Sequence, residues 1–234
     1  MGLKQDLETQ VDAIFRTEWP ERDGRKVPEA EDVKLGNDAV NLDGTVLYAD
    51  LADSTNLVKD YKWWFAAEVY KAYLVCACRI IRQNGGVITA FDGDRVMAVY
   101  IGDGRDPKAV RSALQINYAA TQIITAKISQ VFPRPNGTPY VVKQSVGIDR
   151  SVLYAVRTGI RGSNDLVWVG MAANIAAKMC TIRDDYPIHI TRDVYQNLDD
   201  STTYGGNPRQ NMWSDYYWTE QGTYIHRSTY WWEP

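Results

Sequence analysis

The sequence predicts an α+β fold in which helices pack on one mixed β-sheet. Segments rich in β-branched and aromatic residues alternate with segments of helical periodicity along the chain of 234 residues. Tight turns join some neighbouring strand segments, whereas long helical segments join others, and this mixture is typical of α+β domains. This length and a hydrophobic fraction of 45% are sufficient for a well-buried core.

The N-terminal region predicts one helix and a long connection. Apolar residues recur at helical spacing, so we expect an amphipathic helix over about 3–16. Residues 17–42 hold two prolines and many charges without any periodicity, which is typical of a linker or a surface wrap. The chain is therefore divided into a helix and linker over 1–42 and a folded domain over 43–234.

The first half of the folded domain predicts a strand, a long helix and a β-hairpin. The strand is apolar and β-branched, and it is followed by Asp53, Ser54 and Thr55, which are residue types that begin helices. Glycine-rich turns end the helix and join the two strands of the hairpin. In chain order, these elements are expected at 44–51, 55–83, 87–91 and 95–100.

The second half begins with a helix expected over about 107–131, which Pro133, Pro135 and Asn136-Gly137 would break. An aromatic tail over 204–234 shows an alternation that predicts closing strands. Between them we expect strands at 139–148 and 151–157, a polar glycine-rich loop at 158–166 and a short strand at 167–170. A helix of small residues at 172–179, a strand at 187–191 and a short helix up to about 198 follow.

Composition and charge argue against several classes of protein. The formal net charge is −3, whereas sequence-independent nucleic-acid binding needs a basic face. No apolar run approaches the ~20 residues of a membrane span, and the N-terminus has no apolar signal-peptide core. The three cysteines are interpreted as reduced core residues. We therefore expect a cytoplasmic protein that binds neither nucleic acid nor membrane.

Two aspartates stand where a cation could bind. Asp50 ends an apolar strand, where a carboxylate costs desolvation energy unless it is paired or ligates a cation. Asp94 lies in the hairpin turn and converges on Asp50 if the hairpin lies beside the first strand. Paired carboxylates favour hard cations such as Mg²⁺ or Mn²⁺. By spacing alone, Asp94 could instead be a turn former and Asp50 a strand-end cap.

The turn that follows Asp50 could bind the anion that accompanies such a cation. Ser54 and Thr55 lie at the expected helix N-terminus, where backbone N–H groups can face a phosphate. A metal ion held by Asp50 would bridge oxygens of that phosphate. We therefore expect Ser54 and Thr55 to bind substrate.

Three blocks of the sequence match a known family in the correct order. They read GTVLYADLADST over 44–55, GGVITAFDGDRVMAVY over 85–100 and VGMAANIAAKM over 169–179. These blocks resemble the class III nucleotidyl cyclases, the adenylate and guanylate cyclase family. Within that family the chain is most similar to the pyrimidine cyclases of bacterial Pycsar anti-phage systems, in its length, its lone catalytic domain and its Trp-rich tail. The resemblance implies a ferredoxin-like core and a catalytic role for the domain over 43–234.

The resemblance also implies roles for individual residues. The two metal ligands fall on Asp50 and Asp94, since the family's Gly-Asp followed by Met-Ala-Val selects Asp94 over its competitor Asp92. The transition-state asparagine falls on Asn174, and Lys178 stands where the family usually has arginine. Their spacing puts both on one helix face, although a lysine lacks the bidentate fork of an arginine. Two Mg²⁺ or Mn²⁺ ions would bind per active site.

The family's reaction and assembly follow from the same resemblance. The ribose 3′-oxygen of a nucleoside triphosphate attacks the α-phosphorus in line and pyrophosphate leaves, by two-metal catalysis. Family cyclases are head-to-tail homodimers in which one subunit supplies the aspartates and the other the asparagine and the basic residue. The product would be a second messenger for a separate effector protein in anti-phage defence. Arg227 is a candidate phosphate ligand, whereas His189 and His226 are interpreted as structural or surface residues.

The positions that normally read a purine base are apolar in this sequence, since Ala90 and Val167 occupy them. A buried base without hydrogen-bond partners binds poorly. Tyr48 faces the same side as Asp50 by strand alternation and could fill the space of a purine, although it could also be an ordinary core aromatic. Arg95 could contact phosphate or base, or be a surface charge. We therefore expect UTP to be converted to cyclic UMP.

Several alternatives stay open at this point. The nearest is a cytidylate cyclase that forms cyclic CMP, since uracil and cytosine differ by one donor/acceptor swap. A purine cyclase with relocated base readers is another. Asp50 and Asp94 argue against a degenerate nucleotide-binding module. The sequence also lacks the Gly-Gly-Asp/Glu-Glu-Phe turn of dinucleotide cyclases.

Overall fold

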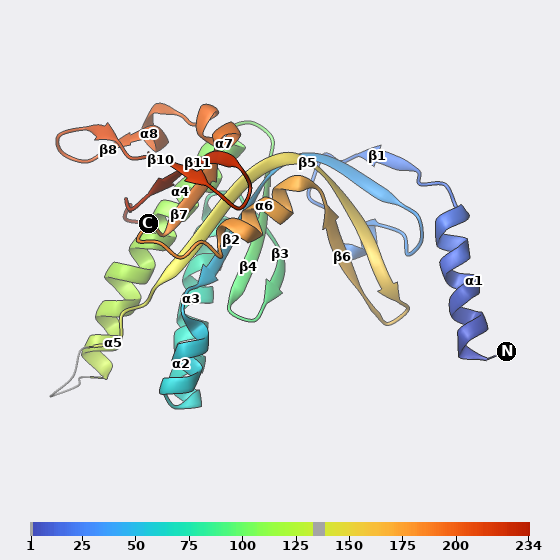
Figure 1. The fold of residues 1–234 in the computed structure, drawn as a ribbon, viewed down its shortest axis with the longest axis horizontal. Coiled ribbons are helices and arrows are strands. Elements are labelled where there is room, and N and C mark those ends of the chain that lie inside the picture. The colour runs from blue at the N-terminus through green and yellow to red at the C-terminus, as the bar shows by residue number, and fades with distance from the viewer. Residues whose placement is uncertain (1, 133–138) are drawn as a thin grey trace.

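The computed structural model describes residues 2–132 and 139–234, and a long mixed sheet runs through them (Figure 1). In this part of the chain nine strands form the sheet, in the order β10-β11-β7-β5-β2-β4-β3, with β1 beside β2 and β6 beside β5. The strands are β1 Glu21–Asp23, β2 Ala39–Leu51, β3 Val87–Asp92, β4 Arg95–Ile101, β5 Gln144–Ile160, β6 Ser163–Val169, β7 Ile188–Thr191, β10 Ser214–Trp218 and β11 Thr223–Ser228. A separate ribbon consists of β8 Tyr204–Gly205 and β9 Gln210–Asn211.

The helices fill the connections between these strands. The α-helices are α1 Leu3–Arg16, α2 Ser54–Asp60, α3 Trp63–Gln83, α4 Arg105–Tyr118, α5 Thr125–Val131, α6 Met171–Met179, α7 Arg192–Gln196 and α8 Asp200–Thr203. A short 3₁₀ helix, η1, spans Ala30–Asp32, and a π-helical segment, η2, spans Ala119–Ile124 between α4 and α5.

The centre of the sheet has ferredoxin-like order. The strands β5, β2, β4 and β3 are neighbours in that sequence, and each adjacent pair is antiparallel. The strand β7 adds to β5 in parallel, which makes the whole sheet mixed. The predicted α+β fold, a mixed sheet with packed helices, is confirmed.

The two faces of β2 have different partners. Leu47 and Leu51 point into the main core, which α3 and α4 complete. Val46 and Tyr48 point to the opposite face, where α6 packs. Because side chains alternate along a strand, Asp50 shares the face of Tyr48 and α6.

Gly147 of β5 permits α6 to approach the sheet closely. A Cβ atom at this position would lie 2.8 Å from the Cβ of Met179 and would overlap the backbone carbonyl of Ala176. The helix packs on β5 and β2 through small alanine side chains. A glycine opposite an alanine-rich helix therefore sets the position of α6.

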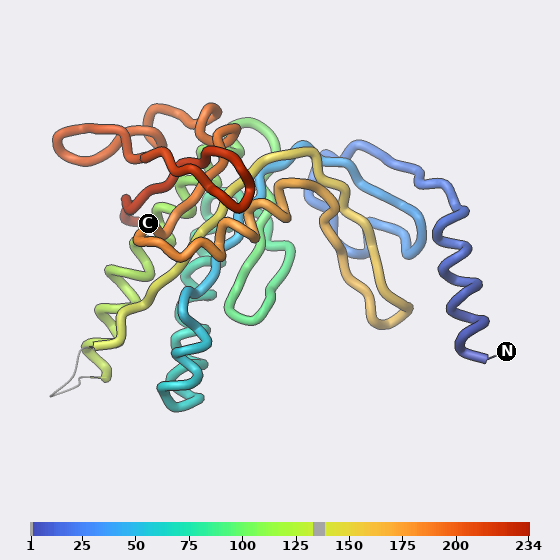
Figure 2. Tube along the Cα trace, viewed as in Figure 1, coloured from blue at the N-terminus to red at the C-terminus, as the bar shows by residue number. Residues whose placement is uncertain are grey.

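The N-terminal helix is confirmed, but the linker expected over 17–42 is wrong in part. The strand β1 pairs in parallel with the start of β2, so residues 39–42 belong to the sheet. The side-chain amide of Asn37 donates to the carbonyls of Ile14 at 2.9 Å and Thr17 at 2.6 Å, which ties the end of α1 to this region. Figure 2 shows α1 at the end of the molecule opposite the C-terminus.

The single helix expected over 55–83 is wrong at one point, because the chain leaves the helix between α2 and α3. Tyr61 follows α2 directly, and its ring stacks on Phe65 with centroids 5.0 Å apart. The same ring meets Tyr140 edge-on at 5.2 Å. Tyr140 is distant in sequence, so helical periodicity could not predict this aromatic cluster.

The helix expected over about 107–131 is confirmed, although its middle is π-helical and it begins two residues early. The hydroxyl of Thr125 donates to the carbonyl of Ala120 at 2.8 Å, five residues back, which matches the wider π turn. The residues expected to end this helix, Pro133, Pro135 and Asn136-Gly137, lie outside the described residues.

The two strands expected at 139–148 and 151–157 form one continuous strand, β5. This strand begins at Gln144, so the expectation for the residues before it is wrong. Unbroken antiparallel pairing with β2 carries β5 through the expected interruption. There the hydroxyl of Thr191 donates to Oδ1 of Asp149 at 2.7 Å, which satisfies a buried polar group within the sheet.

The segment 158–166 is not the loop that its glycines and polar residues predicted. It completes β5 and begins β6, and the two strands form a hairpin. Pairing with a neighbouring strand outweighs the local composition here. The expected hairpin at 87–91 and 95–100 and the helix at 172–179 are confirmed as β3, β4 and α6, and the aromatic tail contributes β10 and β11.

Cys76 and Cys78 are reduced, as expected, and pack against the main core from half-buried positions. All three are free thiols, and Cys180 is buried, whereas Cys76 and Cys78 on α3 are only half-buried. Within residues 2–132 and 139–234, no helix combines the length and the apolarity that a membrane crossing needs.

Candidate active site

Asp50 and Arg95 form the centre of the candidate site. They lie directly opposite each other on β2 and β4, and Nη2 of Arg95 donates to Oδ2 of Asp50 at 3.1 Å. The Asp50 side chain is only 8% exposed. Burial raises the pKa of Asp50, and the Arg95 guanidinium opposes that shift. The strand end therefore holds a buried carboxylate together with a positive group, as such a carboxylate requires.

Asp94 lies beside this pair, at the tip of the β3–β4 hairpin. Its Oδ2 atom is buried and has no hydrogen-bond partner among the described residues. Asp94 directly precedes Arg95, which pairs with Asp50 in the β2–β4 register, and the negative charge of Asp94 contributes to the raised pKa of Asp50. Asp92, the competing candidate, is exposed. This geometry favours Asp94 as the second carboxylate.

Asp50 and Asp94 fit a divalent cation. A buried carboxylate oxygen without a partner is an available hard ligand, and the second carboxylate already faces a positive charge. Within residues 2–132 and 139–234, no cluster of three or more His, Cys, Asp or Glu side chains is suited to a metal ion. Proteins commonly hold Mg²⁺ through one or two carboxylates together with substrate phosphates. Two aspartates are therefore sufficient when a nucleotide completes the coordination.

Tyr48 forms an apolar wall next to Asp50. Its half-buried ring belongs to the cluster of side chains that also contains Ala90, the position expected to lack a purine reader. The Cζ atom of Arg95 lies 6.0 Å from the centroid of the Tyr48 ring. Val167, the other expected reader position, is exposed on β6. The wall beside Asp50 thus combines an aromatic ring, a small apolar residue and one guanidinium.

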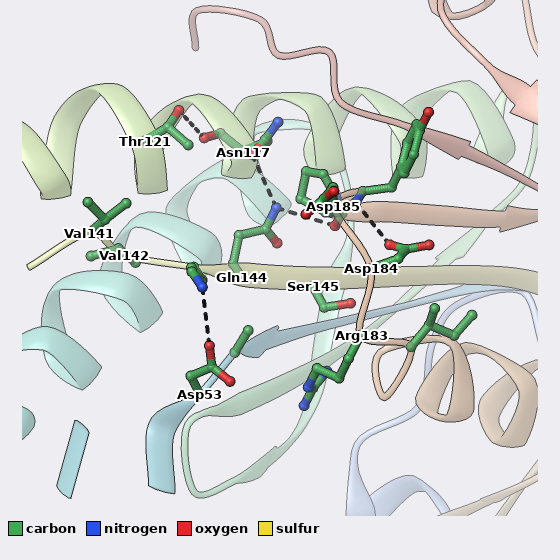
Figure 3. A pocket seen from close by; sticks show the side chains of 15 residues that line it. Asp53, Asn117, Thr121, Val141, Val142, Gln144, Ser145, Arg183, Asp184 and Asp185 are labelled. Atoms are coloured by element: carbon green, nitrogen blue, oxygen red, sulfur yellow. Dashed lines mark hydrogen bonds and ion pairs between the residues drawn. The ribbon is translucent and has the colours of Figure 1, made fainter. Parts of the chain in front are cut away.

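A cavity of about 570 Å³ opens at the same end of β2 (Figure 3). Ser145, which pairs with Asp50 in the β2–β5 register, is one of its lining residues. Arg183 and Lys143 supply positive charge, and Arg183, like Arg95, opposes the burial that raises the pKa of Asp50. Figure 3 shows Arg183 and Asp53 on the same side of β5. The cavity therefore lies next to Asp50 through Ser145, and its lining combines the cations Arg183 and Lys143 with Asp53, Asp184 and Asp185.

Ser54 and Thr55 begin α2 directly after a sharp turn at Asp53, whose φ is 61°. Neither residue lines the cavity, whereas Ala52 and Asp53 do. The sequence thus predicted the correct strand–turn–helix, but the structure brings the two residues before the helix to the cavity.

Asn174 and Lys178 lie together on the exposed face of α6. The opposite face of this helix packs on the sheet through residues such as Ala173 and Ala176. Asn174 and Lys178 therefore point away from the face of β2 that carries Asp50. Within one chain the structure brings Asp50, Asp94, Arg95 and Tyr48 together, and it leaves Asn174 and Lys178 outside that group.

Arg227 and His189 have structural partners. Nη1 of Arg227 donates to Oδ2 of Asp184 at 2.9 Å, and its guanidinium lies over the rings of Tyr186 and Tyr216 at 4.0 and 4.5 Å. His189 is fully buried, and its Nε2 lies 3.3 Å from Asp184. Burial lowers the pKa of His189, which favours the neutral ring.

The chain is similar along its whole length to proteins named uridylate cyclase. It is 44% identical over 235 residues to the uridylate cyclase of Xanthomonas perforans, with 99% of each chain covered. It is 33% identical over 237 residues to the uridylate cyclase of Rhodovulum sp. (strain MB263), with 100% of this chain and 99% of the relative covered. The chain belongs to the uridylate cyclase family.

Solved cyclase structures share the fold of this uridylate cyclase family member. The guanylyl cyclase Cya2 superposes with a TM-score of 0.67 at 15% identity, over 83% of this chain and 95% of Cya2. The adenylyl cyclase CyaB from P. aeruginosa gives 0.62 at 18% identity, over 81% and 95%. No protein-family model matches the chain. The fold is that of class III cyclases, and the protein is a nucleotidyl cyclase, a phosphorus–oxygen lyase.

Sequence reasoning missed two residues at the site of this uridylate cyclase family member. Arg183 lies in the loop between α6 and β7. The sequence there shows a single positive residue and no periodic pattern that would indicate a role in the site. Ser145 pairs with Asp50 through the sheet register, and its buried Oγ has no partner among the described residues. Register between strands distant in sequence is not readable from one sequence, so Ser145 gave no signal.

Proposed function

We propose that this enzyme converts UTP to cyclic UMP and pyrophosphate, as a head-to-tail homodimer with two equivalent sites. The observation that carries the proposal is the cluster of Tyr48, Arg95 and Asp50, in which an aromatic wall and a guanidinium flank a buried carboxylate. The names of the full-length relatives support UTP as the substrate.

The wall beside Asp50 suits uracil. Tyr48 and Ala90 offer no polar side-chain group to a purine edge apart from the tyrosine hydroxyl, and a base without its hydrogen bonds is rejected strongly. Arg95 is close to the ring of Tyr48 and has only donors. Uracil has a carbonyl acceptor, O4, at the ring position where cytosine has an amino group, and an arginine can donate to that carbonyl but cannot pair with the amino group. We therefore favour UTP over CTP.

Asp50 and Asp94 would hold two Mg²⁺ or Mn²⁺ ions, which supply the positive charge that activates the ribose 3′-hydroxyl and neutralises the triphosphate. The cavity at the end of β2 has the volume of a ligand site and would receive the polyphosphate. There Arg183 would balance negative charge, and Lys143 would do so from its present contact 3.5 Å from Asp53. Ser54 and Thr55 would contribute through the backbone at the start of α2.

Asn174 and Lys178 of a partner chain would complete each site. Their position on the outer face of α6 supports this arrangement, because exposed apolar residues lie at the end of β6 and at the start of α6. These residues are Val167, Val169 and Met171. An apolar surface of this kind is typical of a protein–protein contact. Asn174 would orient the ribose, and Lys178 would stabilise charge at the α-phosphate.

The wider setting is proposed from the resemblance of the sequence. Residues 43–234 would form the catalytic domain, and residues 1–42 would lie outside it. Cyclic UMP would be a second messenger of Pycsar anti-phage defence, read by a separate effector protein. The net charge of −3 supports an enzyme that acts on a nucleotide rather than on nucleic acid, and the enzyme would act in the cytoplasm.

Direct competition among the four nucleoside triphosphates tests the substrate. UTP, CTP, ATP and GTP are incubated with the enzyme and Mn²⁺, and the cyclic products are separated by chromatography. We expect kcat/KM for UTP to exceed that for ATP and GTP by at least about 10²-fold, because buried hydrogen bonds would be mismatched with a purine. If ATP or GTP were the best substrate, the proposal would be wrong, and preference for CTP would make the enzyme a cytidylate cyclase.

A Tyr48→Ala variant tests whether the wall selects the base. Removing the ring should reduce the preference for UTP over purines by about tenfold or more, since packing and base contacts are lost together. The matched control is Tyr217→Ala on β10, which removes an exposed tyrosine outside this cluster. Unchanged selectivity of Tyr48→Ala would contradict the assignment of the wall.

A further inference from the structure

Arg95 is held in a fixed position by the sheet. It faces Asp50 across the β2–β4 pairing, so backbone hydrogen bonds set the separation of the two Cα atoms. Its side chain is 25% exposed and that of Asp50 is 8% exposed, which makes the ion pair largely shielded from water. A shielded ion pair is screened little by salt and persists in solution.

The acidic groups near this arginine lie at the candidate metal site or directly beside it. Asp50 accepts its hydrogen bond, and Asp50 and Asp92 both act on it electrostatically. Asp94 precedes it in the chain and acts on Asp50. The other cation that acts on Asp50 is Arg183, from the loop after α6. Arg95 is thus the cation in hydrogen-bond contact with the candidate metal ligand.

Within the described part of the chain, Arg95 also has an unpaired donor atom and a second possible partner, the ring of Tyr48. Its Nε atom is buried and lacks a partner among the described residues, so the present pairing satisfies the side chain only in part. The ring of Tyr48 lies 6.0 Å from its Cζ atom, at the outer limit of a cation–π contact. The guanidinium therefore already lies over that ring at long range, and a closer contact with the ring is open to it once it leaves Asp50.

We propose that Arg95 and a divalent cation compete for the carboxylate of Asp50, and that metal binding releases Arg95 toward Tyr48. This inference rests on the proposed function, because it takes Asp50 as a metal ligand. Two positive groups on one shielded carboxylate repel each other strongly, since little water lies between them. The cation therefore binds Asp50 at the expense of the ion pair.

The competition orders the steps of substrate recognition. While Arg95 is bound to Asp50, it is not free to contact a base beside Tyr48. Once it is released, its donors face the same space as the ring, where a uracil carbonyl could accept from them. Metal binding thereby prepares the base site, and the enzyme reads the base only when its metal ligands are occupied.

Titration of Mn²⁺ without any nucleotide tests the competition directly. Free Mn²⁺ is measured by electron paramagnetic resonance in the wild type, in Arg95→Gln and in Arg95→Lys. We expect Arg95→Gln to bind Mn²⁺ at least about tenfold more tightly, an effect of the size seen when groups around a metal ligand are changed. Arg95→Lys keeps the charge and should stay within about threefold of the wild type.

Two further variants serve as controls for this titration. Arg82→Gln removes an exposed arginine at the end of α3 and should leave Mn²⁺ affinity unchanged. Asp50→Asn should lose tight Mn²⁺ binding whether Arg95 is present or not. Unchanged or weaker Mn²⁺ binding by a folded Arg95→Gln, or equal tightening in Arg95→Lys, would overturn the proposal. Since no nucleotide is present, the outcome does not depend on which triphosphate is the substrate.

Uridine binding tests the release toward Tyr48. Uridine has no phosphate, so it cannot ligate the metal through one. Mn²⁺ should strengthen uridine binding to the wild type by about threefold or more, as expected for one additional charge-assisted hydrogen bond, and should have no effect in Arg95→Gln. If Mn²⁺ left the uridine affinity of the wild type unchanged, the release of Arg95 toward the base site would be contradicted.

Discussion

The two groups of residues that make up the candidate site differ in how the chain holds them. Asp50, Asp94 and Arg95 form a shielded cluster that the sheet register brings together within one chain. Asn174 and Lys178 instead lie exposed on α6, where the sheet does not shield them. The first group is prepared by the fold itself, whereas the second presents its side chains to something outside the chain. This division is what the proposed head-to-tail homodimer predicts.

The structural cause of this difference lies in the two faces of the sheet. The helices α3 and α4 close one face completely, so the core beneath them is large and buried. The helix α6 covers only part of the other face, and β6 extends beside it with Val167 and Val169 exposed. The face of β2 that carries Asp50 and Tyr48 is therefore also the face that is left partly open.

The largest expected effect comes from the shielded group. Asp50→Asn and Asp94→Asn should each lower kcat by about 10³-fold or more while the protein stays folded, because phosphoryl transfer depends on fixed charge at the metal. Steady-state kinetics with UTP and Mn²⁺, with circular dichroism as the check of folding, measure this. Asp92→Asn is the matched control, since Asp92 is exposed at the same hairpin. Near-normal turnover of Asp94→Asn would move the second ligand to Asp92.

A substitution in the exposed group should cause a smaller but measurable loss of catalytic activity. Asn174→Ala should lower kcat by about 10²–10³-fold, the usual cost of one positioned transition-state donor. Mn²⁺ affinity and the free energy of unfolding should not change, because Asn174 is exposed and lies outside the aspartate cluster. If Asn174→Ala weakened Mn²⁺ binding as much as Asp50→Asn does, the division of the site into two groups would be wrong.

The smallest expected effect concerns the packing of α6, the helix that carries the exposed group, on β5. Gly147→Ala would force α6 away from β5, because the new Cβ would collide with Ala176 and Met179. Overpacking of this kind typically lowers the free energy of unfolding by about 1–3 kcal/mol. Denaturant unfolding measures it, with Gly2→Ala as a control at an open position. A stable Gly147→Ala with full activity would show that the placement of α6 is not critical.

Much of this site could be predicted from the sequence, because its signals are local. An aspartate at the end of an apolar strand and another in a two-residue turn indicated a possible cation site, and the resemblance to class III cyclases then selected Asp50 and Asp94 as its ligands. The interruption of the helix at Tyr61, the unbroken course of β5 and the approach of Arg183 all depend on partners distant in the chain. Such contacts leave no periodic pattern, and they account for most of the expectations that were wrong.

Activity of a mixed dimer tests most directly whether each site is built from two chains. Asp50→Asn and Asn174→Ala chains with different affinity tags are co-expressed, and the heterodimer that carries both tags is purified. One of its sites then has an intact Asp50 and an intact Asn174, and the other has neither. We predict up to about half of the wild-type activity per dimer from this single intact site. A purified heterodimer no more active than either variant alone would contradict a site shared between two chains.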